Sequence, residues 1–593
     1  MHSPIDFRHV QASSTDGSIL FDVTDLFVYL SHHLHVSGIQ RVTAKLFDEW
    51  YREPHLVPRR HTYCLIDGET GAIRAVSDRS LRRTLDLIRS ATCTREQLDK
   101  AILACRVGPE IQPSAGDVFF ILGAFWVSPL YTTALMKMRA NGVRIGVYIY
   151  DLIPISHRHF VDTTLADYFP ESAVKVLELC DFIATISRHV AKEVETFVAH
   201  NLRRSVPVTP VVLAQDHIPA EQSKAPSFEV QEASSFSYAL CVGTIEIRKN
   251  HLYLLNLWRR LIAERGEDHV PNLVIVGRWG WRIDEFRRVL EDSEYLNGKV
   301  IVLQSVADND LAFLYRNAFF SIFPSLVEGW GLPIGESLAY GVPCIASNSS
   351  SMPEVGREYV RYIDPLNPSD GYREVAALLD NPDRMKRWKS QLTSFKARQW
   401  REVAAELGEL VSNAPAQSRT SDCFVTVDPG RAVWFSKSRS RQEARRNLRT
   451  HLFQLMFVSG WHEPEPWGGR WARTRSPVLR CLPSSPRPGQ LYRVALRLLL
   501  PGGDAGDLSA HISLQSQDLE SEIALPDWHE RWYFATTRAR ADGALDLCLK
   551  IKGLFPPIPS DPRQLYVGVS AFAFCDESDM SQRVTMMEGL ISS

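Results

Sequence analysis

Short apolar runs alternate with amphipathic stretches from residue 18 to about residue 410, and this alternation constrains the fold more than any other feature. The first series of apolar runs lies at Ile19–Val23, Thr62–Ile66, Val118–Leu122, Val143–Tyr150, Phe182–Ile186 and Val208–Leu213. The second lies at Tyr238–Val242, Leu273–Val276, Val300–Leu303, Phe319–Phe323 and Pro343–Ala346. Apolar strands separated by helices are typical of parallel sheets covered on both faces. The two series predict two doubly wound, Rossmann-like α/β domains, at residues 1–225 and 226–411, with ligands at the carboxyl ends of the strands.

The pattern changes after residue 411. Residues 412–450 are predicted to be a linker with a basic stretch, whose cations are Arg431, Lys437, Arg439, Arg441, Arg445, Arg446 and Arg449. Between residues 451 and 593, apolar and polar residues alternate in runs such as 493–500, 545–552 and 565–569, with Pro- and Gly-rich turns between them. A period of two with such turns predicts an all-β sandwich.

Composition excludes several classes of protein. The formal net charge of −2 gives no argument for nucleic-acid binding. The ten cysteines include no Cys-x-x-Cys pair, so neither a zinc site nor a disulfide framework is expected. No signal peptide is visible, which makes a cytoplasmic setting the default. The uncharged run from Val118 to Met136 is interrupted by Gly123 and Pro129, and we expect a buried strand followed by a helix there.

The segment from Phe323 to Gly341, FPSLVEGWGLPIGESLAYG, carries the most chemical information. It is predicted to run from a buried strand through a glycine-bearing loop into a helix, whose amino terminus can receive an anion. Glu328 lies in the loop and Glu336 on the helix, so both can reach one ligand. Carboxylates suit sugar and ribose hydroxyls because each accepts two hydrogen bonds. For an isolated pair of glutamates, a helix cap and a solvated side chain would be the more ordinary interpretation.

A second segment, CVGTIEIRKN, follows the predicted strand at Tyr238–Val242 and precedes a predicted helix. Arg248 and Lys249 lie in this strand-to-helix loop, where two cations can neutralise a diphosphate leaving group. An arbitrary Arg-Lys pair would more often be a solvated basic loop.

Together the two segments resemble the signature of family-4 retaining glycosyltransferases, which have the GT-B fold. The family pattern of two glutamates separated by seven residues, with Gly-x-Gly-Leu-Pro after the first, is matched by Glu328, Gly329, Gly331, Leu332, Pro333 and Glu336. The family pattern of Val-Gly followed by Arg-Lys-Asn before a helix is matched by Val242-Gly243 and Arg248-Lys249-Asn250. The resemblance covers residues 18–410 and is strong in the second predicted domain.

The resemblance implies a role for each matched residue. Glu328 would contact the transferred sugar and Glu336 the ribose, while the amides between them, including those of Gly329, Gly331 and Leu332, would bind the diphosphate and the sugar. Arg248 and Lys249 would stabilise the leaving group, and Gly243 and Arg278 would line the nucleotide site. Relatives of this fold generally need no metal, and no cofactor is expected beyond the nucleotide sugar as co-substrate, GDP-mannose or a UDP-sugar.

The first half of the chain matches the family less closely. Gly38, in Ser37-Gly-Ile-Gln-Arg-Val, is expected to contact phosphate, although relatives often carry two adjacent glycines there. Asp151 is expected to orient the acceptor or the sugar, but Tyr150 replaces the histidine that usually precedes it. His157 and His159 are weaker candidates for substrate contact. The runs Phe21–Leu26 and Gly38–Val42 indicate a bacterial, mannosyltransferase-like branch.

The expected activity is transfer of a hexose, with mannose from GDP-mannose as first choice, to a glycan or lipid-linked glycan in surface-polysaccharide synthesis, as for lipopolysaccharide O-antigen. Front-face attack and a covalent intermediate on a carboxylate both remain open. The alternatives are a non-catalytic polysaccharide-binding or assembly subunit, or another GT-B enzyme such as a sugar-nucleotide epimerase or a phosphorylase.

The C-terminal part leaves two questions open. Three tryptophans in Ser459–Trp471 either stack on sugars, as in a carbohydrate-binding module, or fill the core of the sandwich. The basic stretch either contacts anionic lipid on the inner face of the plasma membrane or forms a solvated linker helix.

Overall fold

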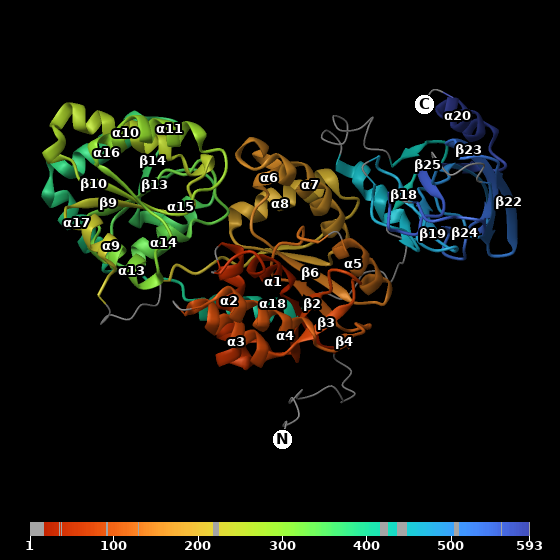
Figure 1. Cartoon of the computed structure of the whole chain (residues 1–593), viewed down its shortest axis with the longest axis horizontal. Helices are drawn as coiled ribbons and strands as arrows, with labels where there is room; N and C mark the ends of the chain where they lie inside the picture. Colours follow the sequence, from red (N-terminus) through yellow and green to blue (C-terminus); the bar gives the residue numbers. More distant parts are fainter. Residues whose placement is uncertain are drawn as a thin grey trace, which may run out of the picture.

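Three bodies follow one another along the long axis of the computed structural model, with the first α/β domain in the middle, the second on one side and a β domain on the other (Figure 1). The structure describes residues 17–34, 36, 38–90, 93–128, 130–216, 225–414, 425–435, 448–465, 467–502, 509–558 and 560–591. The two doubly wound domains and the β-sandwich predicted from the sequence are confirmed.

The first domain is built on an eight-stranded sheet of order β4-β3-β2-β1-β5-β6-β7-β8. Its parallel strands are those expected from the apolar runs: β1 (Ile19–Asp22), β2 (His61–Ile66), β5 (Val118–Ile121), β6 (Arg144–Ile149), β7 (Phe182–Thr185) and β8 (Val208–Pro210). Two short antiparallel strands, β3 (Ile73–Val76) and β4 (Glu110–Ile111), extend one edge and were not predicted. β3 is buried only at its two ends and β4 at neither position, so both lack the apolar run that marks the buried strands.

Helices cover both faces of this sheet. They are α1 (Thr24–Leu30), α2 (Ile39–Arg52), α3 (Asp78–Arg89), α4 (Arg95–Arg106), α5 (Leu130–Ala140), α6 (Ile153–Ser156), α7 (Thr163–Leu179) and α8 (Arg188–Asn201). The uncharged run beginning at Val118 is the strand β5 followed by the helix α5, as expected. Within the described part of the chain, none of the helices has the length and apolar character needed to span a bilayer.

The second domain has a six-stranded, fully parallel sheet of order β11-β10-β9-β12-β13-β14. Its strands are β9 (Tyr238–Val242), β10 (Asn272–Val276), β11 (Val300–Leu303), β12 (Phe320–Phe323), β13 (Cys344–Ser347) and β14 (Arg361–Ile363). The helices that cover it include α10 (His251–Arg265), α13 (Asp308–Asn317), α14 (Leu332–Ala339), α15 (Met352–Gly356), α16 (Pro368–Asp380) and α17 (Pro382–Leu392). Only β14 lies outside the predicted strands.

The helix α18 (Trp400–Ser412), at the end of the range predicted for the second domain, packs on the first domain instead. The indole Nε1 of Trp50 on α2 donates to the Ala404 carbonyl oxygen at 3.0 Å. A Cβ at Gly408 would lie 2.1 Å from the Leu56 carbonyl oxygen, so the close approach of these backbones requires glycine. The chain therefore returns to the first domain before it enters the β domain.

The β domain consists of two facing sheets of mainly antiparallel strands. One has the order β15-β19-β24-β21-β22, where β15 is Thr426–Val427, and the other the order β16-β25-β20-β23, where β16 is Val433–Trp434. Two short strands, β17 (Phe457–Ser459) and β18 (Arg470–Trp471), pair with β19 and β25. Their longer strands are β19 (Val478–Pro483), β20 (Leu491–Leu499), β21 (Ala510–Ser516), β22 (Leu519–Leu525), β23 (Arg531–Arg538), β24 (Leu545–Gly553) and β25 (Gly568–Asp576). The 3-10 helix η6 (Leu448–Met456) packs against α7 and joins the sandwich to the first domain.

The sandwich differs from the prediction at both ends. The strands β15 (Thr426–Val427) and β16 (Val433–Trp434) pair with β19 and β25, although they lie in the stretch predicted to be a linker. Most of the basic stretch, Lys437 to Arg446, lies outside the described residues. At the other end, a helix, α20 (Met580–Ile591), covers the outer face of β25. This is why β25 is buried at every position and shows no alternation.

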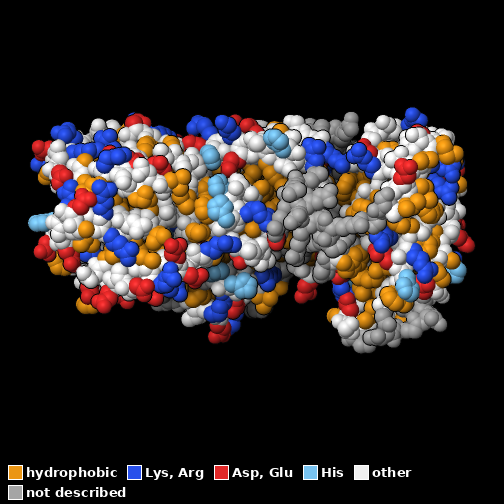
Figure 2. Space-filling view, turned by 90° about the horizontal axis from the view of Figure 1, so that it is seen from above, with side chains coloured by type: hydrophobic (Ala, Val, Ile, Leu, Met, Phe, Trp, Pro, Cys, Tyr) orange, Lys and Arg blue, Asp and Glu red, His pale blue; other side chains and the backbone are white. Residues whose placement is uncertain are grey.

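The surface seen from above carries interspersed acidic and basic side chains over the two α/β domains, and apolar side chains gather more densely on the sandwich (Figure 2). The exposed apolar side chains of α20 are Met580, Val584, Met587 and Ile591, which follow one another at helical spacing.

Candidate active site

Glu328 lies in the loop between β12 and α14, and a run of serines holds this loop in place. The Ser351 hydroxyl donates to the carbonyl oxygens of Glu328 and Trp330, at 2.9 and 2.8 Å. The Glu328 amide donates to the Ser350 hydroxyl at 2.9 Å. With its backbone fixed at three points, the loop presents the Glu328 carboxylate in one direction.

The Glu328 carboxylate is bound by both predicted cations. Lys249 Nζ lies 2.5 Å from its Oε1, and Arg248 Nη1 lies 2.6 Å from its Oε2. The side chain of Glu328 is only 8% exposed. Burial alone would raise the pKa of Glu328, but the adjacent Arg248 and Lys249 lower it to about 2. Glu328 is therefore ionised at any physiological pH.

The two cations sit on a short turn, η3 (Ile247–Lys249), that is itself tied to the glutamate loop. The Arg248 carbonyl oxygen accepts from the Leu326 amide at 2.8 Å. Arg248 Nε also pairs with Glu246, which is buried, at 2.6 Å. The Lys249 ammonium lies 4.8 Å from the centre of the Phe323 ring. Two cations and two carboxylates thus form one compact, nearly buried cluster at the carboxyl ends of β9 and β12.

Asp151, from the first domain, meets this cluster across the domain boundary. It follows β6, and its Oδ1 accepts from the Ile153 amide at 3.0 Å. A Cβ at Gly329 would lie 2.1 Å from the Tyr150 carbonyl oxygen and 3.3 Å from the Asp151 Cβ. Burial raises the pKa of Asp151, an effect that the nearby Arg248 opposes. The structure therefore brings together Asp151, Arg248, Lys249, Glu328 and Gly329.

Tyr150 does not take the place of the histidine expected before Asp151. Its side chain is buried in the first domain, and its hydroxyl donates to the Leu122 carbonyl oxygen at 2.8 Å. His157 Nδ1 contacts the Ser156 hydroxyl at 2.9 Å, and the His159 ring packs on Phe160. These two histidines therefore engage their own loop.

Because the Tyr150 side chain is buried and its hydroxyl donates to the Leu122 carbonyl oxygen, Tyr150→Phe should leave the transfer rate within about twofold of wild type. It should lower the free energy of unfolding by about 1 kcal/mol, the contribution of one buried hydrogen bond. Urea unfolding and an activity assay on the same protein check this together. A large loss of activity at near-normal stability would contradict the placement.

The glycines of the site serve different needs. Gly331 precedes α14 at a φ of +113°, and no side chain caps this helix; Pro333 has no amide hydrogen, and the Ile334 amide donates to the Gly331 carbonyl oxygen at 3.0 Å. Gly243 has a φ of +145°, and a Cβ there would lie 3.6 Å from the Lys249 ammonium. Gly38 precedes α2 at a φ of +52°, again without a side-chain cap. Ser37 lies outside the described residues.

Glu336 lies one turn into α14 and is 3% exposed. Its Oε2 accepts from the Tyr315 hydroxyl at 2.9 Å, and its Oε1 lies 3.0 Å from Arg41 Nη2. Arg41 belongs to the first turn of α2, in the first domain, so this ion pair crosses the domain boundary. Arg278 also crosses it, since its guanidinium donates to the Tyr29 hydroxyl at 2.9 Å. Glu336 and Arg278 of the second domain thus each contact the first domain, while Gly38 and Leu332 lie at the starts of the helices α2 and α14 that carry the Arg41–Glu336 pair.

Comparison with known proteins identifies the class of the second α/β domain. Residues 224–394 match the family described as Glycosyl transferases group 1.

These residues form a group 1 glycosyltransferase domain.

Curated relatives extend the match. The Escherichia coli "Serotype-specific mannosyltransferase WbdA" is 29% identical over 251 residues, which are 41% of this chain and 30% of that protein. The Escherichia coli "O-antigen chain mannosyltransferase B" is 30% identical over 222 residues, 35% of this chain and 57% of that protein. This chain therefore spans less than two thirds of the length of either relative. The solved structure of Anabaena Alr3699/HepE with UDP and glucose has a TM-score of 0.45 at 11% identity, covering 67% of this chain and 99% of that chain.

The candidate site also contains residues that the sequence did not indicate, from both α/β domains. Arg41 and Tyr315 bind Glu336, Glu246 binds Arg248, and the serines at 350 and 351 bind the loop. The serine run is visible in the sequence, but it is also what an ordinary loop would contain. Of the described residues, no group of three or more His, Cys, Asp or Glu is arranged to hold a metal ion.

The three tryptophans near the start of the sandwich pack against their neighbours and form no exposed platform. Trp461 lies edge-on to Phe457 and donates through Nε1 to the Val478 carbonyl oxygen at 2.8 Å. The Trp467 ring covers Gly469 and lies edge-on to Trp471. All three are half-buried, which supports the packing interpretation over the carbohydrate-binding one.

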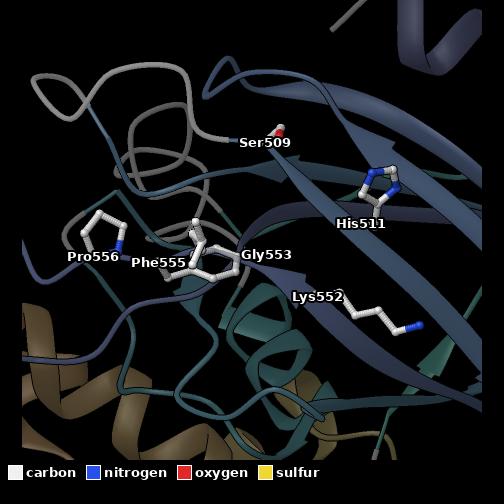
Figure 3. A pocket seen from close by; sticks show the side chains of 7 residues that line it. Ser509, His511, Lys552, Gly553, Phe555 and Pro556 are labelled. Atoms are coloured by element: carbon white, nitrogen blue, oxygen red, sulfur yellow. The ribbon is translucent and has the colours of Figure 1, made fainter.

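The sandwich has a hollow lined by residues of β21, the end of β24 and the segment that follows β24 (Figure 3). His511 on β21 and Lys552 on β24 are register partners and extend from neighbouring strands beside Phe555. The remaining lining residues are Ser509, Gly553, Leu554 and Pro556. Because these residues belong to the sandwich alone, the hollow takes no part in the cluster around Glu328.

Proposed function

We propose that this protein is a retaining, metal-independent hexosyltransferase that moves mannose from GDP-mannose to a glycan or lipid-linked glycan acceptor. The observation that carries the proposal is the cluster in which Arg248 and Lys249 bind Glu328 beside Asp151 of the other domain. The choice of mannose is supported by the names of the two Escherichia coli relatives, both mannosyltransferases. A UDP-sugar is the second candidate for the donor, and no further cofactor is proposed.

Arg248 and Lys249 would stabilise the departing diphosphate, together with the amino-terminal end of α14, which no side chain caps. Fixed cations in a nearly buried site act strongly on developing negative charge, because little water screens them. These two side chains would take over the charge neutralisation that a divalent cation supplies in other transferases. Glu328 would hold both cations in place and accept hydrogen bonds from the transferred sugar.

Front-face attack suits this site better than a covalent intermediate. Both oxygens of Glu328 are engaged in ion pairs, which lowers their nucleophilicity toward the sugar. In the proposed step, the bond from the anomeric carbon to the phosphate oxygen breaks as the acceptor oxygen bonds to the same face of that carbon. The proton of the acceptor hydroxyl passes to a diphosphate oxygen, so the products are a glycoside and a nucleoside diphosphate. Asp151 would orient the acceptor hydroxyl or the sugar.

We further propose a cytoplasmic location, with peripheral contact to the inner face of the plasma membrane where a lipid-linked acceptor would be met. The cations between residues 431 and 449 support this on charge alone. Nucleic acid is not among the proposed partners, since the net charge of −2 provides no extended positive field.

The test is a donor screen with the purified protein, using GDP-mannose, UDP-sugars and dTDP-sugars. We expect release of nucleoside diphosphate with one of these donors, and a product that keeps the anomeric configuration of the donor sugar in NMR spectra. The rival hypothesis, a non-catalytic polysaccharide-binding subunit, predicts glycan binding without any release. An inverted product would contradict the retaining assignment but not the transfer itself.

A further inference from the structure

The ion pair between Arg41 and Glu336 links the two α/β domains at the place where the nucleotide is proposed to bind. Arg41 Nη2 lies 3.0 Å from Glu336 Oε1, and the Glu336 side chain is only 4% exposed. Burial alone would lower the pKa of Arg41, but Glu336 beside it, together with Asp308, raises it. Arg41 is therefore protonated, and it reaches Glu336 from the helix α2 of the first domain.

The two partners of Glu336 occupy different oxygens. Arg41 binds Oε1, and the Tyr315 hydroxyl donates to Oε2 at 2.9 Å. Each carboxylate oxygen has two acceptor positions. One acceptor position on each oxygen thus remains for a ligand. The two adjacent hydroxyls of a ribose, each donating one hydrogen bond, require two such positions.

The partners also come from different domains. Tyr315, on α13, is buried in the second domain and stays with Glu336 in any relative position of the domains. Arg41, on α2, reaches Glu336 only when the domains are closed. A second hydrogen bond crosses the boundary between Arg278 and Tyr29.

We propose that Arg41 is a positioning residue that couples domain closure to ribose binding by fixing the Glu336 carboxylate for the two ribose hydroxyls. This inference rests on the proposed function, because it assigns Glu336 to the ribose of the donor nucleotide. A nucleotide bound to Glu336 and the Arg41 side chain in the closed state stabilise the same carboxylate. Nucleotide binding and domain closure therefore favour each other. Water excluded by this closure no longer competes for the activated sugar.

The test compares GDP with 2′,3′-dideoxy-GDP, which lacks both ribose hydroxyls, by isothermal titration calorimetry; UDP and its dideoxy analogue replace them if the donor screen selects uridine. In Arg41→Ala we expect the Kd for GDP to rise about tenfold, within the usual range of coupling between two sites. The Kd for the dideoxy nucleotide should change little, because that ligand does not use Glu336. Arg41→Lys, which keeps the charge but not the planar fork, should restore part of the GDP affinity.

Arg52→Ala is the matched control on the same helix. Arg52 is 60% exposed and pairs only locally, with Glu49 at 3.0 Å, so this variant should bind both nucleotides as the wild type does. Thermal unfolding of all variants shows that the second domain is intact.

Three results would overturn the inference while leaving the proposed function standing. These are unchanged GDP binding in Arg41→Ala, an equal loss for both nucleotides, or tighter GDP binding, which would make Arg41 a competitor of the ribose. If the wild-type protein bound no nucleoside diphosphate at all, the proposed function itself would fall, and the inference with it.

Discussion

Lys249→Ala is expected to lower kcat/KM for the donor sugar by about 10²–10³-fold, the usual cost of removing one group that stabilises the transition-state charge. Lys249 is 11% exposed on its side chain and lies 2.5 Å from Glu328, so no solvent cation can replace it. Steady-state rates of nucleoside diphosphate release measure the effect. The free energy of unfolding should also fall by about 2 kcal/mol, because a hydrogen bond to a buried charge is lost.

Two variants separate the role of Lys249 in the reaction from its role in stability. Lys249→Arg keeps a cation and should recover part of the rate. Lys192→Ala removes an exposed lysine from α8 and should change neither rate nor stability. Full activity in Lys249→Ala would show that the diphosphate is neutralised elsewhere.

Gly329→Ala should reduce the transfer rate by about 10²-fold, since a displacement of about 1 Å between reacting groups has costs of this size. The added methyl group would lie 2.1 Å from the Tyr150 carbonyl oxygen, so the domains could not approach as closely as they do. The clash lies between domains and outside either core. The midpoint of thermal unfolding should therefore move much less than the rate.

Gly68→Ala is the control for this variant. Gly68 lies in a turn of the first domain, and a Cβ there meets nothing within 4 Å. This variant should behave as the wild type in both measurements. A fully active Gly329→Ala would contradict the close approach of the Glu328 loop to Asp151 during the reaction.

The parts of the fold that the sequence predicted are those with a strong local signal. Buried parallel strands such as β5 and β9 are apolar at nearly every position, and this pattern needs no tertiary context. The short strands β3, β4 and β14 have no such pattern. The outer face of β25 is buried only because α20 covers it, a contact that no periodicity reports.

The candidate site also contains residues with a strong local sequence signal and residues without one. The residues in contiguous motifs, Arg248, Lys249 and Glu328, could be found because each motif has a recognisable spacing, and the structure brings all three together. Arg41 could not be connected with Glu336, because their contact depends on how two domains close. The sequence showed that Tyr150 stands where relatives have a histidine. The burial of its side chain in the first domain could not be predicted, because it depends on how that domain packs.

Calorimetric titration of the wild-type protein and Lys249→Ala with GDP and with guanosine tests most directly whether the Arg248–Lys249 pair binds a diphosphate. The account predicts that the wild type binds GDP at least about 100-fold more tightly than guanosine, as charge-assisted bonds to phosphate would provide. In Lys249→Ala this ratio should fall by about tenfold or more, while guanosine binds as before. An unchanged ratio, or a wild-type protein that does not distinguish the two ligands, would contradict the donor site described here; UDP and uridine replace the pair if the screen selects uridine.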